Sequence, residues 1–236
     1  MRNKLITTES EKLEYYKGLL IHAHSGLHES AASLCKKYLP IGKEVIDIGA
    51  GAGAFTQRLV DENYKVTALD LSKSGWPLND IEFIELNIDF GIFKSLNNRV
   101  FDCACCLEVV EHLENPWNLF REIFRIVRPG GYLVLSTPNI TSFLSRMYFL
   151  RSGEFFQFNG NTLEYGHINP ISDFEISLIA EKVGWRLIEK QPAGYLPIFR
   201  LTNPRHLLTN IFRGLSYILS KGNKNGWCML YIFQKL

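Results

Sequence analysis

Two groups of residues in the sequence could do chemistry, and each follows a short apolar segment. Glu108-Val-Val-Glu111-His112 places two carboxyl groups and an imidazole within five residues. If the chain turns helical here, the three side chains fall at i, i+3 and i+4 and share one face. Carboxylates and an imidazole grouped in this way could bind Mg²⁺, Mn²⁺ or Zn²⁺. Three roles stay open: a metal site, a metal-free acid–base pair of Glu108 and His112, and packing.

The second group is a glycine loop with an acidic residue on either side. Asp47 precedes Gly49-Ala-Gly51-Ala-Gly53, and Asp70 ends the next apolar segment. Glycines after a strand let the backbone turn tightly and approach a ligand closely. The loop also fits the loose dinucleotide fingerprint G-x-G-x-x-A, which would indicate NAD. A carboxylate at Asp47 would repel a pyrophosphate, whereas it suits a ligand that carries an ammonium group.

The elements that must position these groups form an alternating pattern, which predicts a doubly wound α/β fold with a mostly parallel sheet. Strands are expected over 45–48, 65–69, 81–86, 100–107, 132–136, 185–190 and 228–234. Helices are expected over 9–20, 26–39, 54–62, 116–127, 173–183 and 204–220. Such sheets bind ligands at the carboxyl ends of their strands, where both groups are expected to lie.

Composition excludes several classes of protein. The chain has 236 residues and a formal net charge of +2, so nucleic acid is not an expected partner. Three of the five cysteines, Cys103, Cys105 and Cys106, fall within one expected strand, and free buried thiols suit a reducing, cytoplasmic location. We expect no secretion signal and no transmembrane segment, because no run of about 20 apolar residues occurs.

One domain is expected to span residues 1–236. Its expected parts are N-terminal helices (1–41), a cofactor-binding core (42–137), an acceptor-pocket and lid insertion (138–171), and C-terminal helices with the last strands (172–236).

Four motifs, in order along the chain, resemble those of the class I S-adenosylmethionine-dependent methyltransferases. They are Val45-Ile-Asp-Ile-Gly-Ala-Gly-Ala-Gly53, Ala68-Leu-Asp-Leu-Ser72, the segment 101–113, and Arg128-Pro-Gly-Gly-Tyr-Leu-Val-Leu-Ser-Thr-Pro-Asn139. The resemblance covers about residues 42–139 and weakens towards 190. It implies a Rossmann-like, mostly parallel seven-stranded sheet with helices on both faces and an antiparallel last strand.

The same resemblance implies S-adenosyl-L-methionine as the cofactor. Asp70 would hold the ribose hydroxyls, Asp47 would face the methionine ammonium, and Leu107 would offer backbone groups to the methionine moiety. The adenine would lie near Leu71 and the end of the third strand. The cofactor-binding residues expected are Asp47, Gly49, Gly51, Gly53, Asp70, Leu71, Asn87, Ile88, Asp89 and Leu107.

The Glu-x-x-Glu-His block resembles an element of two branches of this family: ubiquinone-pathway O-methyltransferases and small-RNA terminal 2′-O-methyltransferases. The resemblance implies a divalent metal held by Glu108, Glu111, His112 and His167. It favours O-methylation of a small-molecule, glycan or lipid-linked acceptor. An RNA 2′-O-methyltransferase and a non-catalytic S-adenosylmethionine-binding protein remain as alternatives.

Three further features bear on the acceptor. The aromatic stretch 143–158 follows the fifth strand, where an apolar cleft could form. The segment 204–220 could lie on a membrane surface, although packing on the sheet is favoured. A surface role is favoured for the three N-terminal histidines, His22, His24 and His28. The alternative is that they border the cofactor site, because the resemblance implies an N-terminal helix that covers the cofactor.

Overall fold

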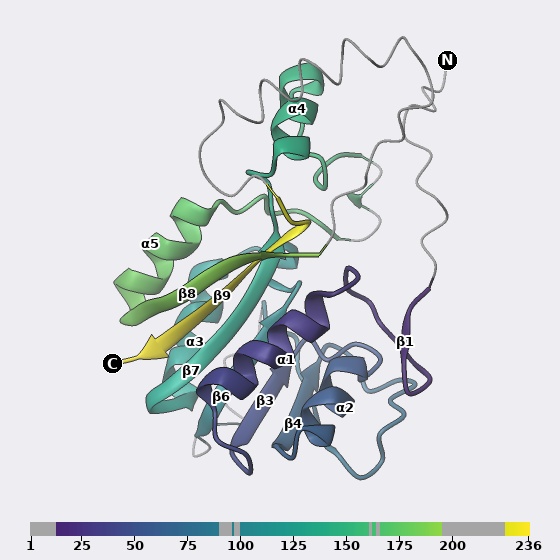
Figure 1. The fold of residues 1–236 in the computed structure, drawn as a ribbon, viewed down its shortest axis with the longest axis vertical. Helices are drawn as coiled ribbons and strands as arrows, with labels where there is room; N and C mark the ends of the chain where they lie inside the picture. Colours follow the sequence, from purple (N-terminus) through teal and green to yellow (C-terminus); the bar gives the residue numbers. More distant parts are fainter. Residues whose placement is uncertain (1–12, 90–95, 97–99, 161, 164–165, 195–224) are drawn as a thin grey trace.

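Seven strands form one sheet in the order β5-β4-β3-β6-β7-β9-β8. The computed structural model describes residues 13–89, 96, 100–160, 162–163, 166–194 and 225–236 (Figure 1). The strands are β3 (Glu44–Ile48), β4 (Lys65–Asp70), β5 (Glu82–Glu85), β6 (Phe101–Leu107), β7 (Val127–Pro138), β8 (Trp185–Ala193) and β9 (Cys228–Lys235). The strands β3 to β7 are parallel, and β9 runs antiparallel to both β7 and β8. This arrangement confirms the predicted fold.

Strand order changes direction between β3 and β6. From β3 the chain proceeds outwards to β4 and β5, and then returns to place β6 on the other side of β3. Loops that leave the carboxyl ends of β3 and β6 therefore diverge, and ligands of open α/β sheets bind at such a point. The glycine loop follows β3 and Glu108 follows β6, so both predicted groups flank this point.

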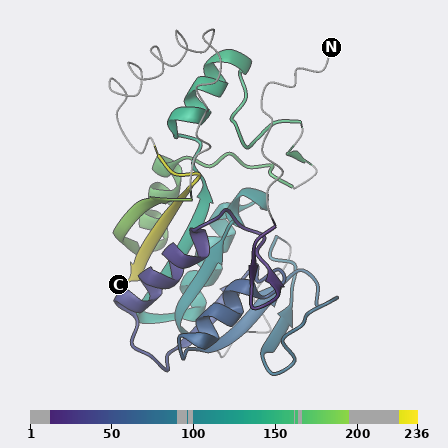
Figure 2. The ribbon, with the colours of Figure 1, turned by 45° about the vertical axis from the view of Figure 1, so that its right-hand side comes forward.

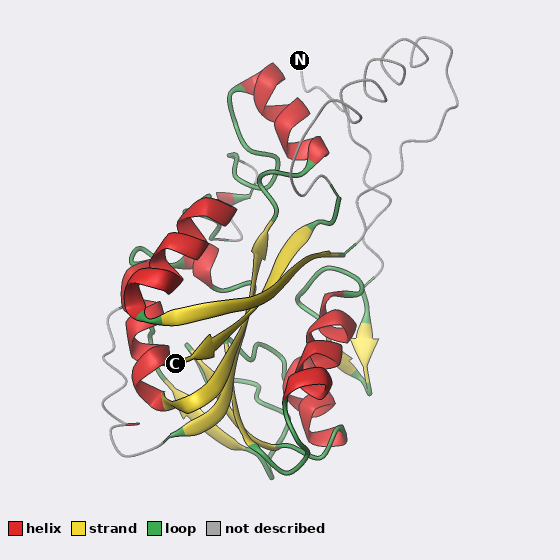
Figure 3. Cartoon of the chain, turned by 60° about the vertical axis from the view of Figure 1, so that its left-hand side comes forward, coloured by secondary structure: helices red, strands yellow, loops and turns green. Residues whose placement is uncertain are grey.

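Helices cover both faces of the sheet (Figure 3). The helices α1 (Leu27–Tyr38) and α2 (Ala54–Asp61) pack on one face, and α3 (Pro116–Ile126) and α5 (Asp173–Val183) pack on the other. Successive strand residues point to opposite faces, so β6 sends Cys103 and Cys105 towards α1, and Ala104 and Cys106 towards α3.

The boundaries of α3 and α5 follow from their caps. The side chain of Asn115 accepts a hydrogen bond from the Asn118 amide at 3.0 Å, with Pro116 at the first helical position, as predicted. Ser172 caps α5 in the same way, and Gly184 ends that helix with a φ of +111°.

The prediction of a helix over 9–20 is wrong for its described part. Residues 13–20 form a hairpin of β1 (Tyr15–Tyr16) and β2 (Leu19–Leu20). Lys17 and Gly18 connect the strands with φ values of +50° and +82°, and two such residues favour a tight hairpin. Asp61 of α2 holds the turn, because it accepts hydrogen bonds from Tyr16 and Lys17, both at 2.7 Å.

The segment after β7 leads away from the sheet. The helix α4 (Phe143–Ser152) projects beyond the carboxyl end of β7 (Figures 1 and 2). The helix expected over 204–220 lies outside the described residues. Within the described part of the chain, every helix is too short or too polar to cross a bilayer.

Candidate active site

The glycine loop leaves β3 at Gly49 and enters α2 at Ala54. Gly49 has a φ of +78°, and a Cβ atom there would lie 2.3 Å from Cγ2 of Val109. The amides of Gly49 and Ala50 donate to the carbonyl oxygen of Leu69 at 2.8 and 3.1 Å. The loop is therefore fixed between the end of β4 and the residues after β6, with no room for a side chain at Gly49.

Asp70 lies at the end of β4 and faces this loop. Its Oδ2 accepts a hydrogen bond from the Gly51 amide at 2.7 Å, and its Oδ1 accepts one from the Leu71 amide at 2.6 Å. A carboxylate has about four acceptor positions, so these bonds leave capacity for two hydroxyl groups. Asp70 is half-buried, and Leu71 beside it is 60% exposed.

Asp47 lies beneath the loop and is almost fully buried. It is 2% exposed, and its Oδ2 accepts a hydrogen bond from Oγ1 of Thr56 at 2.5 Å. Burial raises the pKa of Asp47 to about 7; the Thr56 hydrogen bond opposes this rise, and the negative charge of Asp70 contributes to it. A cationic group next to Asp47 would favour its ionised form.

One cavity joins several of the predicted cofactor residues. Asp47, Gly49, Gly51 and Leu107 all line it, so the structure brings together residues from the ends of β3 and β6. The N-terminal segment and the first turn of α1 line the same cavity through Leu20, His22, Ala23 and His28.

The predicted surface role of the N-terminal histidines is wrong for His28, which is 7% exposed. Its ring lies 5.1 Å from that of Phe55, and burial lowers its pKa to about 4. The sequence carried a signal for this burial, because His28 precedes Ala31 and Cys35 on one stripe of α1. His22 is exposed, yet its Nδ1 lies 3.5 Å from where a Cβ of Gly51 would be.

The residues predicted near the adenine have different surroundings. Asn87 is exposed, whereas Ile88 is buried in the core beneath α3. The Oδ1 atom of Asp89 accepts a hydrogen bond from the Glu114 amide at 2.9 Å. Of these three side chains, Asn87 is therefore the most accessible to a ligand.

Three of the four predicted metal ligands meet in space. Possible ligand atoms of Glu111, His112 and His167 all lie within 4.8 Å of one another. The rings of His112 and His167 are 4.9 Å apart, edge to face. The backbone explains this contact, because the Ile168 and Asn169 amides donate to the carbonyl oxygen of Glu111 at 3.1 and 2.9 Å.

Glu111 has an unusual environment for a carboxylate. It is 0% exposed, and among the described residues neither carboxylate oxygen has a hydrogen-bond partner. Burial, together with the charge of Glu108, raises the pKa of Glu111 well above its ordinary value. Buried charges are normally paired or coordinate metals, so a divalent cation fits these residues. The Nδ1 atom of His167 lies 2.9 Å from the Gln157 carbonyl oxygen, which orients the ring as in metal sites.

Glu108 lies outside this group. It has a φ of +55° and precedes a short 3-10 helix, η2 (Val110–His112), so the predicted helical spacing of Glu108, Glu111 and His112 is wrong. Its carboxylate accepts hydrogen bonds from Ser136 at 2.8 Å and from the Cys228 thiol at 3.0 Å. These bonds turn Glu108 towards β7 and β9.

A row of ring side chains lies beside His112 and His167, and we call it the aromatic wall: His24, Phe156, Phe158 and Trp227. The sequence did not predict that these residues come together. The ring of Phe158 lies 5.4 Å from His167, and His24 lies 3.7 Å from Trp227. Trp227 in turn lies 5.2 Å from Phe156. Burial lowers the pKa of His24 to about 3, and the nearby His167 adds to that effect. Residues from three distant segments therefore form one side of the site.

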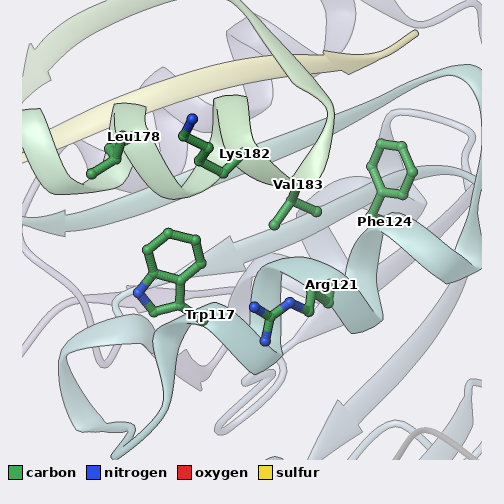
Figure 4. A pocket seen from close by; sticks show the side chains of 6 residues that line it. All are labelled: Trp117, Arg121, Phe124, Leu178, Lys182 and Val183. Carbon is green, nitrogen blue, oxygen red and sulfur yellow. The ribbon is translucent and has the colours of Figure 1, made fainter.

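A larger hollow of about 470 Å³ lies elsewhere, between α3 and α5 (Figure 4). Trp117 and Arg121 of α3 face Leu178 and Lys182 of α5 across it. No predicted site residue lines this hollow, so its size alone does not connect it with the chemistry described above.

The sequence model of a methyltransferase domain family matches residues 23–190. This range contains the glycine loop, Asp70 and the three residues Glu111, His112 and His167, which we call the Glu111 group. The chain belongs to the class I S-adenosylmethionine-dependent methyltransferases. The matched region of this methyltransferase begins just before α1 and ends within β8. The family predicted from the motifs is therefore confirmed.

Curated relatives of the methyltransferase include ubiquinone biosynthesis O-methyltransferases. The protein of Vibrio vulnificus is 30% identical over 112 residues, which are 44% of this chain and 48% of that protein. The match thus spans about half the length of that relative. The protein of Coxiella burnetii is 29% identical over 166 residues, which are 66% of this chain and 69% of that protein.

Solved structures agree with the fold of the methyltransferase. An S-adenosylmethionine-dependent methyltransferase from Archaeoglobus fulgidus has a TM-score of 0.62 at 18% identity, and the alignment covers 88% of this chain and 94% of that one. The N-methyltransferase NodS from Bradyrhizobium japonicum, in complex with S-adenosyl-L-homocysteine, has a TM-score of 0.55 at 15% identity, with 89% of each chain covered.

Proposed function

We propose that this methyltransferase transfers a methyl group from S-adenosyl-L-methionine to a hydroxyl oxygen of a small molecule that contains a ring. One observation carries the proposal: beside the segment that follows β6, the His112 and His167 imidazoles meet the Glu111 carboxylate, which has no hydrogen-bond partner among the described residues. The glycine loop is in contact with the same segment, because Gly49 packs against Val109. A cofactor on the loop and an acceptor at the histidines would therefore be neighbours.

The cofactor half of the proposal assigns a part of the ligand to each acidic residue. Asp70 would accept hydrogen bonds from the ribose hydroxyls, since its carboxylate is half-buried and already oriented by Gly51 and Leu71. Asp47 would face the ammonium group, whose charge would offset the burial of the carboxylate. When bound, the cofactor supplies a methyl carbon that its sulfonium has already activated.

The acceptor half of the proposal concerns the removal of a proton from the acceptor hydroxyl, which the cofactor does not provide. A phenol has a pKa of about 10, so a hydroxyl acceptor must be deprotonated. When no metal is bound, His112 offers an imidazole nitrogen for that proton. A Cβ atom at Gly166 would lie 3.1 Å from Nδ1 of His112, so the chain packs closely against the ring. We assign Glu108 a positioning role, because both of its carboxylate oxygens already accept hydrogen bonds, from Ser136 and from Cys228.

A divalent metal would be held by Glu111, His112 and His167. The paired imidazoles and one carboxylate suit Zn²⁺ or Mn²⁺ better than Mg²⁺, which prefers oxygen ligands. Such an ion would lower the pKa of an acceptor hydroxyl.

The aromatic wall supports a small molecule with a ring as the acceptor. Phe158, Trp227 and Phe156 present ring faces and edges next to the histidines, and aromatic pairs prefer offset or edge-to-face contacts. The ubiquinone-pathway names of the curated relatives support the same class of acceptor. Five free, buried cysteines support a reducing, cytoplasmic location.

Two measurements test this function. Calorimetric titration with S-adenosyl-L-methionine should give binding in wild type, and a panel of phenols and catechols should accept radiolabelled methyl groups. Transfer should be compared in EDTA and with Mn²⁺, Zn²⁺ or Mg²⁺, and His112→Ala should lower the rate by about 10²–10⁴-fold. Cofactor binding without transfer would favour the non-catalytic or the RNA alternative, and absence of cofactor binding would overturn the proposal.

A further inference from the structure

Three cysteines from two distant parts of the chain form a cluster in the core beneath α1. Their sulfur atoms all lie within 4.8 Å of one another, and those of Cys35 and Cys105 are 3.7 Å apart. Cys103 and Cys105 are two residues apart on β6, so they point to the same face of the sheet. All three are 0% exposed, and none has a disulfide partner.

We propose that Cys35, Cys103 and Cys105 form a binding site for a soft monovalent metal ion, Cu(I). The site is separate from the Glu111 group, whose carboxylate and imidazoles suit harder or borderline ions. Thiolate ligands select soft ions. A metal–sulfur bond is about 2.3 Å long, so three sulfurs around one ion lie about 4 Å apart, which matches the cluster.

The surroundings favour Cu(I) over Zn²⁺. Structural Zn²⁺ sites take four ligands in a tetrahedron, whereas the group found among the described residues consists of three cysteines alone. The cluster is packed among apolar side chains, including Leu34, Val45 and Leu59. Uncompensated charge is unfavourable there. One of the three sulfurs would bind as a thiolate after losing its proton to solvent, which balances the single charge of Cu(I). The other two would bind as neutral thiols through a sulfur lone pair, and no oxidation state changes.

Such an ion would join α1 to β6. The first turn of α1 carries His28, which lines the cavity beside the glycine loop. Because the ion would bind the folded chain and not the unfolded one, it should raise the unfolding temperature.

The test is an anaerobic competition between the full chain and bicinchoninate for Cu(I). The ion is added to native protein and, in a second arm, is present during refolding, because the cluster is buried. Wild type should retain one equivalent of Cu(I) in at least one arm, with a raised unfolding temperature. Cys35→Ala and Cys105→Ala should bind at least tenfold more weakly.

Two variants control for other sites. Cys106→Ala removes a buried thiol from the same strand but the opposite face, and should retain Cu(I). His112→Ala changes the Glu111 group and should retain Cu(I) as well. If wild type retains no Cu(I) in either arm, or if Cys106→Ala loses as much as Cys35→Ala, the proposal is wrong.

Discussion

The Asp70 carboxylate accepts a hydrogen bond from the Gly51 amide at 2.7 Å, which ties the end of β4 to the loop after β3. The two residues are 19 positions apart, yet they belong to neighbouring parallel strands. This bond orients the carboxylate before any ligand binds. Asp70 is therefore expected to contribute to affinity without first having to be ordered.

We predict that Asp70→Ala weakens the binding of S-adenosyl-L-methionine about 10- to 150-fold. A hydrogen bond to a charged group contributes about 1.5–3 kcal/mol, and 1.4 kcal/mol is about tenfold in affinity. Calorimetric titration measures the change. Asp80→Ala, in an exposed turn, is the matched control and should bind as wild type does. Unchanged affinity in a folded Asp70→Ala variant would contradict the assignment.

Asp47 predicts a pH dependence of cofactor affinity. Its pKa is about 7 in the ligand-free fold, and a bound ammonium group would lower it. Binding should then release a proton below pH 7, so affinity should rise with pH by up to about tenfold per unit. Above about pH 8 the rise should stop, because an α-amino group begins to lose its own proton. Titrations at several pH values measure the slope.

The Asp47 carboxyl should also make stability depend on pH. As pH rises, cofactor affinity should increase, whereas the free energy of unfolding of the ligand-free chain should decrease. The folded pKa of about 7 exceeds the ordinary value of 3.8, so the unfolded chain loses the proton first as pH rises. Between these values Asp47 should lower the free energy of unfolding of the ligand-free chain. Urea unfolding of wild type and Asp47→Asn should therefore diverge across this range, with the variant gaining relative stability. Parallel pH profiles would contradict the prediction.

Gly49 and Gly42 form a matched pair for the glycine loop. Both have a φ of +78°, but a Cβ at Gly42 would meet nothing within 4 Å, while one at Gly49 would lie 2.3 Å from Val109. An alanine in the left-handed region of φ costs about 1–2 kcal/mol, and Gly49→Ala and Gly42→Ala should both lose this amount of stability. Gly49→Ala should lose about 1–3 kcal/mol more, from overpacking. Urea unfolding compares them, and equal losses would show that Val109 moves aside without penalty.

Local sequence patterns predicted the sheet better than the site. The positions of the glycine loop and Asp70 in the fold could be predicted, because the loop directly follows the apolar strand β3 and Asp70 is the last residue of β4. The hairpin at 13–20 was missed because Asp61, 44 residues from Lys17, holds its turn. Likewise, contact between His24 and Trp227, or between Cys35 and Cys105, depends on tertiary packing that no local pattern encodes.

The Glu108 prediction failed for a local reason. The spacing of Glu108, Glu111 and His112 would place them on one face only if the helix began at Glu108. The left-handed φ of Glu108 instead delays the turn until Val110, and the Ser136 hydroxyl binds both the amide and the carboxylate of Glu108. A non-glycine residue in this region of φ could not be foreseen from residue types.

Glu111 leads to a prediction about metal binding and stability. Its buried carboxylate has no hydrogen-bond partner in the part of the chain that the structure describes, so a divalent ion at Glu111, His112 and His167 should stabilise the fold. At a concentration of about 100 times its Kd, the ion should raise the Tm of wild type by about 5–10 °C. Glu111→Gln should lose most of this increase, because an amide is a weaker ligand and carries no charge. Scanning fluorimetry with Mn²⁺ or Zn²⁺, against EDTA, measures the shift.

The neighbouring Glu114 provides the control for that experiment. It is exposed and lies outside the Glu111 group, so Glu114→Gln should keep the full metal-dependent rise in Tm. In EDTA, wild type and Glu111→Gln should unfold within about 1 kcal/mol of each other, since glutamine matches glutamate in size. A rise in Tm that is equal in wild type, Glu111→Gln and Glu114→Gln would mean that the ion binds elsewhere on the chain.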